Sequence, residues 1–353
     1  MRNLFLFIIT SVFAISCIRI NEPVVIDPVK LRVSPNGFFI VNEGNFGWGN
    51  GSLTYFSYDS VKTYNNFFEA VNKRPLGDVP YSMIVYGNYI YIVVNNSEKI
   101  EVIDRLSLES KATITGLISP RNIAVTGDHK AYVTSMYSDS LRILDLKTNK
   151  ISGHINIKNS SEAVVVQGKK AFIANWIGGN EIFIVNTDTD QLIDSVEVGP
   201  EPESMVADKN GIIWVLCNGG WTRENFAELI GINHETNEVV KQFTFPSRMN
   251  SPLNLTRDSD GDTLFYIDEG IQCMNINSSV LPSSPFIDRG NKQFYRIGIN
   301  PVNGNIVATD ALDYQQNGYF MIYSGKGAFV SSHQAGIIPG NICFLVNPGH
   351  TTE

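Results

Sequence analysis

The side chains of this chain that are best suited to chemistry are aromatic rings and amides, which occur together in short glycine-rich segments. Three of the four tryptophans, Trp48, Trp176 and Trp221, stand in such segments, among them "NEGNFGWGN" (42–50) and "NWIGGN" (175–180). Flat aromatic faces supply apolar contact area, while amides both donate and accept hydrogen bonds. This mixture predicts non-covalent binding of a large, mostly neutral ligand that carries amides or hydroxyls of its own.

A repeat of about 40 residues must position these segments. Units that begin at Pro80, Pro120, Ser161 and Pro202 each contain a short apolar run, a turn, a second run led by an aromatic, a polar loop and further alternating runs. Four short strands in about 40–50 residues are typical of one blade of a β-propeller. The chain is therefore predicted to be all-β.

The repeat also predicts the number of blades and how the ring closes. Six blades are expected at about 80–118, 120–158, 161–199, 201–246, 251–288 and 294–334. Residues 37–72 supply later strands but lack a first strand, whereas Pro339–Val346 form a first strand without a blade. Joining them completes a blade and leaves no open sheet edge. The predicted fold is a seven-bladed β-propeller over residues 36–353, closed by the C-terminal strand joining blade 1.

In such a ring, the loops before each first strand and between the second and third strands emerge on one face. Aromatic, amide and charged residues gather in these loops, while the turns of the opposite face are short. The candidate binding residues are Asn45, Phe46, Trp48, Tyr81, Asn95, Arg121, Tyr137, Trp176, Glu203, Trp221, Arg296 and Tyr314, with Arg121, Glu203 and Arg296 as polar anchors. Exposed aromatics among amides indicate a recognition surface. The alternative is that they only plug the mouth of the channel.

The N-terminus predicts a lipid anchor. Residues 1–16 combine Arg2 with an apolar stretch that is too short for a membrane span, as in a signal peptide. Ala14-Ile15-Ser16-Cys17 reads as a lipobox, in which Cys17 becomes the lipidated first residue. The alternative is a simple secretion signal with an incidental cysteine. Residues 17–35, with three prolines, are expected to form a tether.

The lipobox, the tether, the segment "FFIVNEGNFGWGNGSLTYFS" (38–57) and the seven-blade pattern together resemble a family of surface lipoprotein propellers of Gram-negative gut bacteria with YncE-like repeats. That family includes cobalamin-binding lipoproteins that cap a TonB-dependent outer-membrane transporter. The resemblance covers most of residues 36–347. It implies a lipid-anchored outer-membrane protein at the cell surface that captures cobalamin or related corrinoids and passes them to such a transporter. The corrinoid would be cargo, and no cofactor is expected. Residues 18–22 match the family's acidic export signal poorly, which leaves periplasmic retention open.

Other functions receive less support from the sequence. A formal net charge of −8 argues against a nucleic-acid partner, which requires a basic surface. Acidic residues at Glu43, Glu203, Asp268, Glu269 and Asp310 could converge on a metal, as in lactonase-like propellers. The five histidines form no set, and neither a GxSxG nor an HExxH motif occurs. We therefore expect neither enzyme activity nor a metal site. A protein-interaction scaffold and a glycan-binding lipoprotein are the alternatives.

Overall fold

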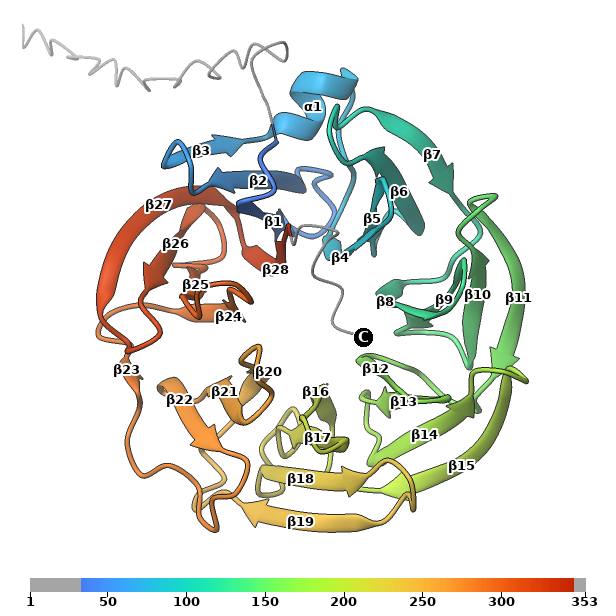
Figure 1. The fold of residues 1–353 in the computed structure, drawn as a ribbon, viewed down its shortest axis with the longest axis vertical. Coiled ribbons are helices and arrows are strands. Elements are labelled where there is room, and N and C mark those ends of the chain that lie inside the picture. The colour runs from blue at the N-terminus through green and yellow to red at the C-terminus, as the bar shows by residue number, and fades with distance from the viewer. Residues whose placement is uncertain (1–32, 346–353) are drawn as a thin grey trace, which may run out of the picture.

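The computed structural model describes residues 33–345. It contains seven four-stranded antiparallel sheets arranged around a central axis (Figure 1). The predicted all-β fold, the seven blades and their closure by the C-terminal strand are confirmed. The predicted signal segment 1–16, the predicted lipidation site Cys17 and residues 346–353 lie outside the described residues.

The strands are given for each blade from the innermost to the outermost. Blade 1 contains β28 (Pro339–Phe344), β1 (Gly37–Asn42), β2 (Ser52–Ser57) and β3 (Lys62–Asn65), and blade 2 contains β4 (Pro80–Tyr86), β5 (Tyr89–Val94), β6 (Lys99–Asp104) and β7 (Ser110–Ile114). Blade 3 contains β8 (Pro120–Gly127), β9 (Lys130–Ser135), β10 (Ser140–Asp145) and β11 (Lys150–Asn156). Blade 4 contains β12 (Val164–Gln167), β13 (Lys170–Asn175), β14 (Glu181–Asn186) and β15 (Gln191–Glu197).

The remaining three blades follow the same order. Blade 5 contains β16 (Pro202–Ala207), β17 (Ile212–Cys217), β18 (Glu228–Asn233) and β19 (Val239–Thr244). Blade 6 contains β20 (Leu253–Arg257), β21 (Thr263–Ile267), β22 (Gly270–Asn275) and the short β23 (Ile287–Asp288). Blade 7 contains β24 (Phe294–Ile299), β25 (Ile306–Asp310), β26 (Asn317–Tyr323) and β27 (Phe329–Ile337).

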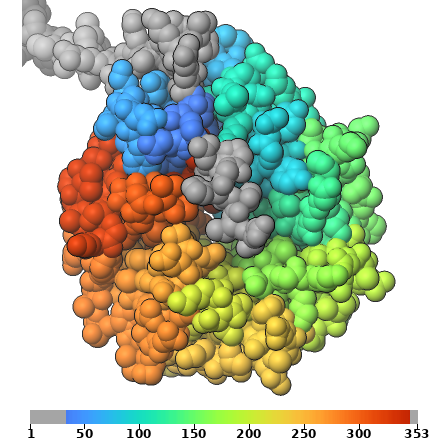
Figure 2. All heavy atoms as spheres, in the orientation of Figure 1, coloured from blue at the N-terminus to red at the C-terminus, as the bar shows by residue number. Residues whose placement is uncertain are grey.

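The two ends of the described chain close the ring within blade 1. Strand β28 pairs antiparallel with β1, so that Phe38 lies opposite Phe344 and Ile40 opposite Ile342. Figure 2 shows the resulting contact between the blue N-terminal and red C-terminal segments. Closure pairs the edge of β1 that would otherwise stay open. Strands from the two ends of the described chain thus share one sheet, which closes the ring.

The hydrophobic core is divided into seven clusters, one at each interface between neighbouring blades. Strand β14 shows how alternation produces this division. Ile182 and Ile184 face the interface with blade 5, while Phe183 and Val185 face the interface with blade 3. Successive side chains of a strand point to opposite faces of the sheet, so each blade contributes to two clusters. The blades are therefore packed on both faces and form a rigid support for their loops.

One helix interrupts the strand pattern, and the sequence did not predict it. Helix α1 (Phe67–Asn72) follows β3 and buries Phe67 and Phe68 completely in the cluster between blades 1 and 2. Just beyond it, Arg74 forms an ion pair of 2.6 Å with Glu101, whose side chain is fully buried. A six-residue segment carries too little periodicity to distinguish helix from strand, so tertiary packing decides its conformation.

Contacts with blade 1 begin earlier than the predicted boundary of the tether. Val33 packs against the cluster between blades 1 and 2, and the Ser34 N–H donates a hydrogen bond of 2.8 Å to Tyr55 Oη. The last three residues of the segment assigned to the tether, 33–35, thus lie against the propeller. Within residues 33–345, no helix has the length and hydrophobicity needed to cross a membrane.

Candidate binding face and channel

Bulges in the innermost strands turn side chains into the central channel. The pairing register shifts between Pro80 and Ser82 in β4, and between Pro202 and Ser204 in β16. Corresponding shifts interrupt the pairing of β8, β20, β24 and β28. A bulge leaves a residue outside the hydrogen-bonded ladder and re-aims its side chain. Tyr81 and Glu203 occupy these released positions and reach the axis of the ring.

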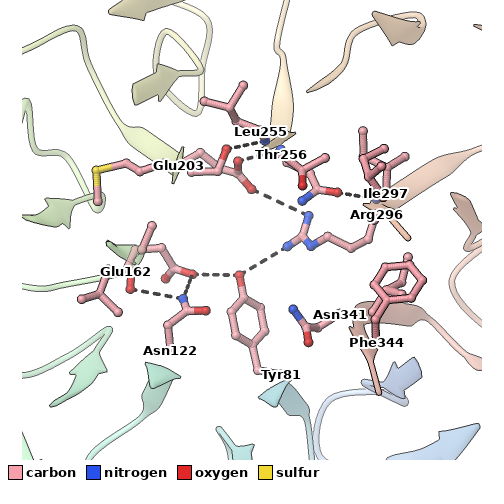
Figure 3. A pocket seen from close by; sticks show the side chains of 18 residues that line it. Tyr81, Asn122, Glu162, Glu203, Leu255, Thr256, Arg296, Ile297, Asn341 and Phe344 are labelled. Atoms are coloured by element: carbon pink, nitrogen blue, oxygen red, sulfur yellow. Dashed lines mark hydrogen bonds and ion pairs between the residues drawn. The ribbon is translucent and has the colours of Figure 1, made fainter. Parts of the chain in front are cut away.

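The released residues join with Glu43, which follows β1, and Glu162, which precedes β12. We call the connected set the polar belt: Glu43, Tyr81, Arg121, Glu162, Glu203, Tyr295 and Arg296. Tyr81 Oη donates to Glu162 Oε1 at 2.8 Å, and Arg121 Nε donates to Glu162 Oε2 at 2.7 Å. On the other side, Arg296 Nη2 donates to Tyr81 Oη at 3.3 Å, and Arg296 Nη1 lies 3.7 Å from Glu203 Oε1. Figure 3 shows this chain of interactions crossing the channel from Glu162 to Glu203.

Aromatic rings complete the belt. The Arg121 guanidinium lies 3.5 Å from the centre of the Tyr81 ring and 5.7 Å from that of Trp176. The Arg296 guanidinium lies 4.6 Å from the centre of the Tyr295 ring. Cations placed over aromatic faces are stabilised by the ring quadrupole, most strongly where water is excluded. Both arginines are therefore held by carboxylates at their edges and by rings at their faces.

Burial and charge set the protonation of the belt. Burial opposes the charge of Arg121, yet the Glu162 carboxylate holds the pKa of Arg121 above its ordinary value. Burial raises the pKa of the Tyr81 phenol, which therefore stays protonated and available as a donor. Burial also raises the pKa of Glu43, partly offset by the charge of Arg296 and by the hydrogen bond of 2.8 Å that Tyr295 Oη donates to Glu43 Oε1. The surroundings of Glu43 therefore disfavour its charged form.

A cavity of about 330 Å³ adjoins the belt within the channel (Figure 3). Its walls include the belt residues Tyr81 and Arg296 together with Ile299 and Phe344, which lie at the ends of β24 and β28. The innermost strands begin at the loop-rich face and run away from it, so the cavity lies on the far side of the belt from that face. Asn341 also lines it, and its buried Oδ1 has no hydrogen-bond partner among the described residues. The cavity is thus small and polar, and it is separate from the aromatic loops.

The loops of the other side of the belt carry the exposed aromatics that the sequence singled out. We call these residues the aromatic rim: Phe46 (75% exposed), Trp48 (78%), Tyr137 (70%), Trp221 (84%) and Tyr314 (40%). Backbone hydrogen bonds show that the two predicted classes of loop do share one face. The Met136 N–H donates to the Ser119 carbonyl at 3.0 Å, and the Gly219 N–H donates to the Pro200 carbonyl at 3.3 Å. In both cases a loop between the second and third strands contacts a loop before a first strand.

The longest contribution to the rim, the loop between β1 and β2, is held in a defined shape. Gly44 has a φ of +72°, and a Cβ there would lie 2.4 Å from Asn50 Oδ1, so only glycine fits. Asn45 Nδ2 donates to the Tyr314 carbonyl at 2.8 Å, which ties the loop to blade 7. The Gly47 N–H donates to Asp78 Oδ2 at 2.8 Å, which ties it to blade 2. Phe46 and Trp48 are therefore exposed on a loop that is anchored on both sides.

The structure divides the predicted binding residues into two groups and leaves one apart. Tyr81, Arg121, Glu203 and Arg296 belong to the belt, and the half-buried Trp176 lies against it with an indole N–H that has no partner. Phe46, Trp48, Tyr137, Trp221 and Tyr314 form the rim, with Asn45 beneath it. Asn95 is buried, and its Nδ2 donates to Ser119 Oγ at 3.0 Å and to the Pro120 carbonyl at 2.9 Å. Asn95 therefore connects blades 2 and 3 and has no amide hydrogen left for a ligand.

Three belt residues were not among the predicted binding residues. Glu162 is 3% exposed and joins Arg121, Tyr81 and the Asn122 amide. It stands second in its repeat, as Tyr81, Arg121 and Glu203 do in theirs, so the repeat position was a signal that could have found it. Glu43 was considered only as a possible metal ligand, and Tyr295 was not singled out as a binding residue. Within the described part of the chain, no three His, Cys, Asp or Glu residues are grouped so that they could hold a metal ion.

These features define a seven-bladed β-propeller with a charged belt across its channel and an aromatic rim on one face. Residues 36–334 match a family model described as "Domain of unknown function (DUF5074)", and the chain belongs to that family. No functionally curated protein matches its sequence.

Solved structures that resemble the chain are propellers with little sequence identity to it. A quinonprotein alcohol dehydrogenase-like protein from Bacteroides thetaiotaomicron VPI-5482 gives a TM-score of 0.69 at 13% identity, over 90% of this chain and 79% of its own. The hydrazine synthase of Kuenenia stuttgartiensis gives 0.59 at 12% identity, over 74% and 88%. The computationally designed Ika8 protein gives 0.58 at 10% identity, over 88% and 93%. At such identities the likeness extends to the fold alone.

Proposed function

We propose that this protein is a ligand-capture propeller of the outer membrane that binds cobalamin or a related corrinoid at its aromatic rim and passes it to a TonB-dependent transporter. The observation that carries the proposal is the rim itself. Five exposed aromatic side chains lie on anchored loops of one face, above a belt of buried charges. Aromatic and arginine side chains on a rigid support are the groups that most often dominate binding energy.

The size of the cavity favours binding at the rim over binding in the channel. Small-ligand pockets typically have volumes of roughly 300–1,000 Å³, and the channel cavity, at about 330 Å³, lies at the small end of that range. A corrinoid with its nucleotide loop is much larger than this. A corrin ring would instead lie across the rim, where its apolar edges meet Trp48 or Trp221 and its peripheral amides meet the loop amides.

A binding role also agrees with the state of the belt carboxylates. Glu162 accepts hydrogen bonds from Tyr81 and Arg121, and Glu203 Oε2 accepts one of 2.8 Å from the Asn254 N–H. Carboxylates engaged in this way position neighbouring groups and are poor candidates for a general base, which requires a free lone pair directed at the substrate. We therefore propose that the protein captures its ligand without converting it.

Calorimetry of the soluble domain tests the capture step. Cyanocobalamin titrated into residues 30–353 should bind saturably and near one to one. Replacing Trp48 and Trp221 together by alanine should lower the affinity by at least about tenfold, since each removes a flat apolar contact. Phe329→Ala is the matched control, because Phe329 is 60% exposed and lies at the face of the ring opposite the aromatic rim. Absence of heat at micromolar concentrations would reject the corrinoid and direct the search to glycans and protein partners.

Whole cells test the lipid anchor and the handover. Cys17→Ala removes the predicted lipidation site while leaving the propeller unchanged. Uptake of cyanocobalamin at nanomolar concentration should then fall, because the captured ligand no longer stays beside the transporter. Unchanged uptake, with the variant protein present at normal abundance, would contradict an anchored role in transport.

A further inference from the structure

Two arginines at the loop-rich face of blades 5 and 6 have no carboxylate partner within residues 33–345. Arg223 lies in the loop between β17 and β18, and Arg248 in the connection between β19 and β20. These two loops are joined by a hydrogen bond of 2.9 Å from the Phe245 N–H to the Ala227 carbonyl. Strand directions place both loops on the face that carries the rim. They bring the two positive charges onto one corner of the binding face.

The side-chain contacts of these arginines are with a thioether and an aromatic ring. Arg223 Nη1 donates a weak hydrogen bond of 3.7 Å to Met249 Sδ, and the Arg248 guanidinium lies 5.4 Å from the centre of the Phe226 ring. Across residues 33–345, neither arginine forms an ion pair, whereas Arg121 and Arg74 are each paired with a buried glutamate. The carboxylate of Glu224, next to Arg223 in sequence, accepts a hydrogen bond of 2.7 Å from Thr222 Oγ1 and forms no ion pair with either arginine within residues 33–345.

The same two loops carry three exposed apolar side chains. Trp221 is 84% exposed, Met249 68% and Phe226 41%. We call the five residues Trp221, Arg223, Phe226, Arg248 and Met249 the arginine patch. The chain as a whole carries a net charge of −8, and the arginine patch places two exposed positive charges among aromatic and thioether side chains.

The chemistry of the patch selects an oxyanion attached to a flat or apolar group. The guanidinium is a rigid fork of donors that matches the oxygens of a phosphate or carboxylate, and charge-assisted bonds of this kind are roughly twice as strong as neutral ones. Trp221 supplies a flat face beside the charges for the rest of the ligand. A neutral ligand would satisfy the aromatic part of the patch and leave both arginines unmatched.

We propose that the arginine patch is an oxyanion subsite that binds a phosphodiester of the captured ligand while an adjoining planar part of the ligand lies on Trp221. The inference rests on the proposed function and sharpens it. Cobalamin carries a phosphodiester in its nucleotide loop, whereas cobinamide has the corrin ring but lacks the nucleotide and its phosphodiester. The subsite therefore predicts which corrinoids the protein prefers.

The experiment compares cyanocobalamin with dicyanocobinamide by calorimetry. Arg223→Gln/Arg248→Gln removes both charges and keeps the length and polarity of the side chains. Lys147→Gln/Arg257→Gln is the matched control, because it removes two exposed positive charges from the opposite face, one in the turn after β10 and one at the end of β20. The wild-type domain should bind cyanocobalamin more tightly than dicyanocobinamide. The patch variant should lose about tenfold or more in affinity for cyanocobalamin and less than about twofold for dicyanocobinamide, while the control should change neither. Added salt should weaken the binding of cyanocobalamin to the wild-type domain more steeply than the binding of dicyanocobinamide.

The outcomes separate the subsite from the function on which it rests. If both ligands bind the wild-type domain and the patch variant weakens neither, the subsite is wrong and corrinoid capture stands. Equal weakening of both ligands would also overturn the subsite, because it would show that the patch acts on the corrin ring or on the loops. If neither ligand binds the wild-type domain, the proposed function itself fails, and the corrinoid subsite fails with it.

Discussion

The aromatic rim lies on the loop-rich face of the ring and the polar belt lies below it in the channel, yet the protein holds the two sets of residues in different ways. Most belt residues sit at bulges of the innermost strands, while Glu43 follows β1 and Glu162 precedes β12. The belt is largely buried and its hydrogen bonds join several blades. Rim residues sit on loops, and their rings are mostly exposed. Buried charged networks are costly to leave incomplete, whereas exposed side chains contribute little to folding.

The comparison separates stability from recognition. The belt connects blades 1 to 5 and blade 7 across the channel, so its integrity should determine how well the ring resists unfolding. The rim contributes contact area that folding does not need. A change in the belt should therefore appear first in the free energy of unfolding, and a change in the rim first in ligand affinity.

The largest effect should come from removing the carboxylate at the centre of the belt. Glu162→Ala leaves the guanidinium of Arg121, which is 8% exposed, without its partner. Breaking one side of a buried pair typically costs about 3–5 kcal/mol, and urea unfolding would measure it. Glu162→Gln, whose amide oxygen still accepts a hydrogen bond, should cost less. A loss below about 1 kcal/mol for the alanine variant would break the comparison.

A smaller loss is expected when only the phenolic hydroxyl of the belt is removed. Tyr81→Phe keeps the ring beneath Arg121 but deletes the oxygen that links Glu162 to Arg296. The free energy of unfolding should fall by about 1–2 kcal/mol. Tyr137→Phe removes a hydroxyl from an exposed rim residue and should leave stability unchanged. Equal effects of the two substitutions would mean that the belt is not special.

A pH-dependent effect should come from Glu43. Because burial raises the pKa of this carboxyl in the folded protein, its ionisation opposes folding. The stability that the protonated Glu43 carboxyl contributes is therefore fully present below its pKa in the unfolded chain, about 4.3. This stability is lost as the pH rises through the higher pKa of the folded protein. Glu43→Gln can still accept from Tyr295, so its stability relative to wild type should increase from pH 4 to pH 7. Urea unfolding across that range would measure this, and a constant difference would contradict the raised pKa.

The smallest effect on stability is expected at the rim. Trp48→Ala and Trp221→Ala should each change the free energy of unfolding by less than about 0.5 kcal/mol, because the two indole rings are mostly exposed and make few contacts in the folded protein. Chemical unfolding of the two variants, beside the wild-type domain, checks this. A loss of about 2 kcal/mol or more would show that the rim supports the fold and would blur its separation from the belt.

Much of the fold could be predicted because the repeat expresses local rules. Alternating strands such as "IFIVN" (182–186), separated by polar turns, define a blade without reference to any other blade. The missing first strand of residues 37–72 and the unpartnered strand near Pro339 predicted the closure in the same way. Helix α1 was missed because six residues carry no reliable period, and its two phenylalanines become helical only where the interface of blades 1 and 2 can bury them.

The sequence by itself determined the strands, the number of blades, the closure of the ring and the face on which the aromatic loops emerge, since each of these follows from patterns a few residues long. Only the tertiary structure decided which side chains meet. Glu162 and Tyr81 are 81 positions apart, and Arg296 lies 215 positions from Tyr81. Their contacts depend on bulges that form when the blades pack and on a closed ring that brings distant repeats to one axis. No short segment of the sequence determines either feature.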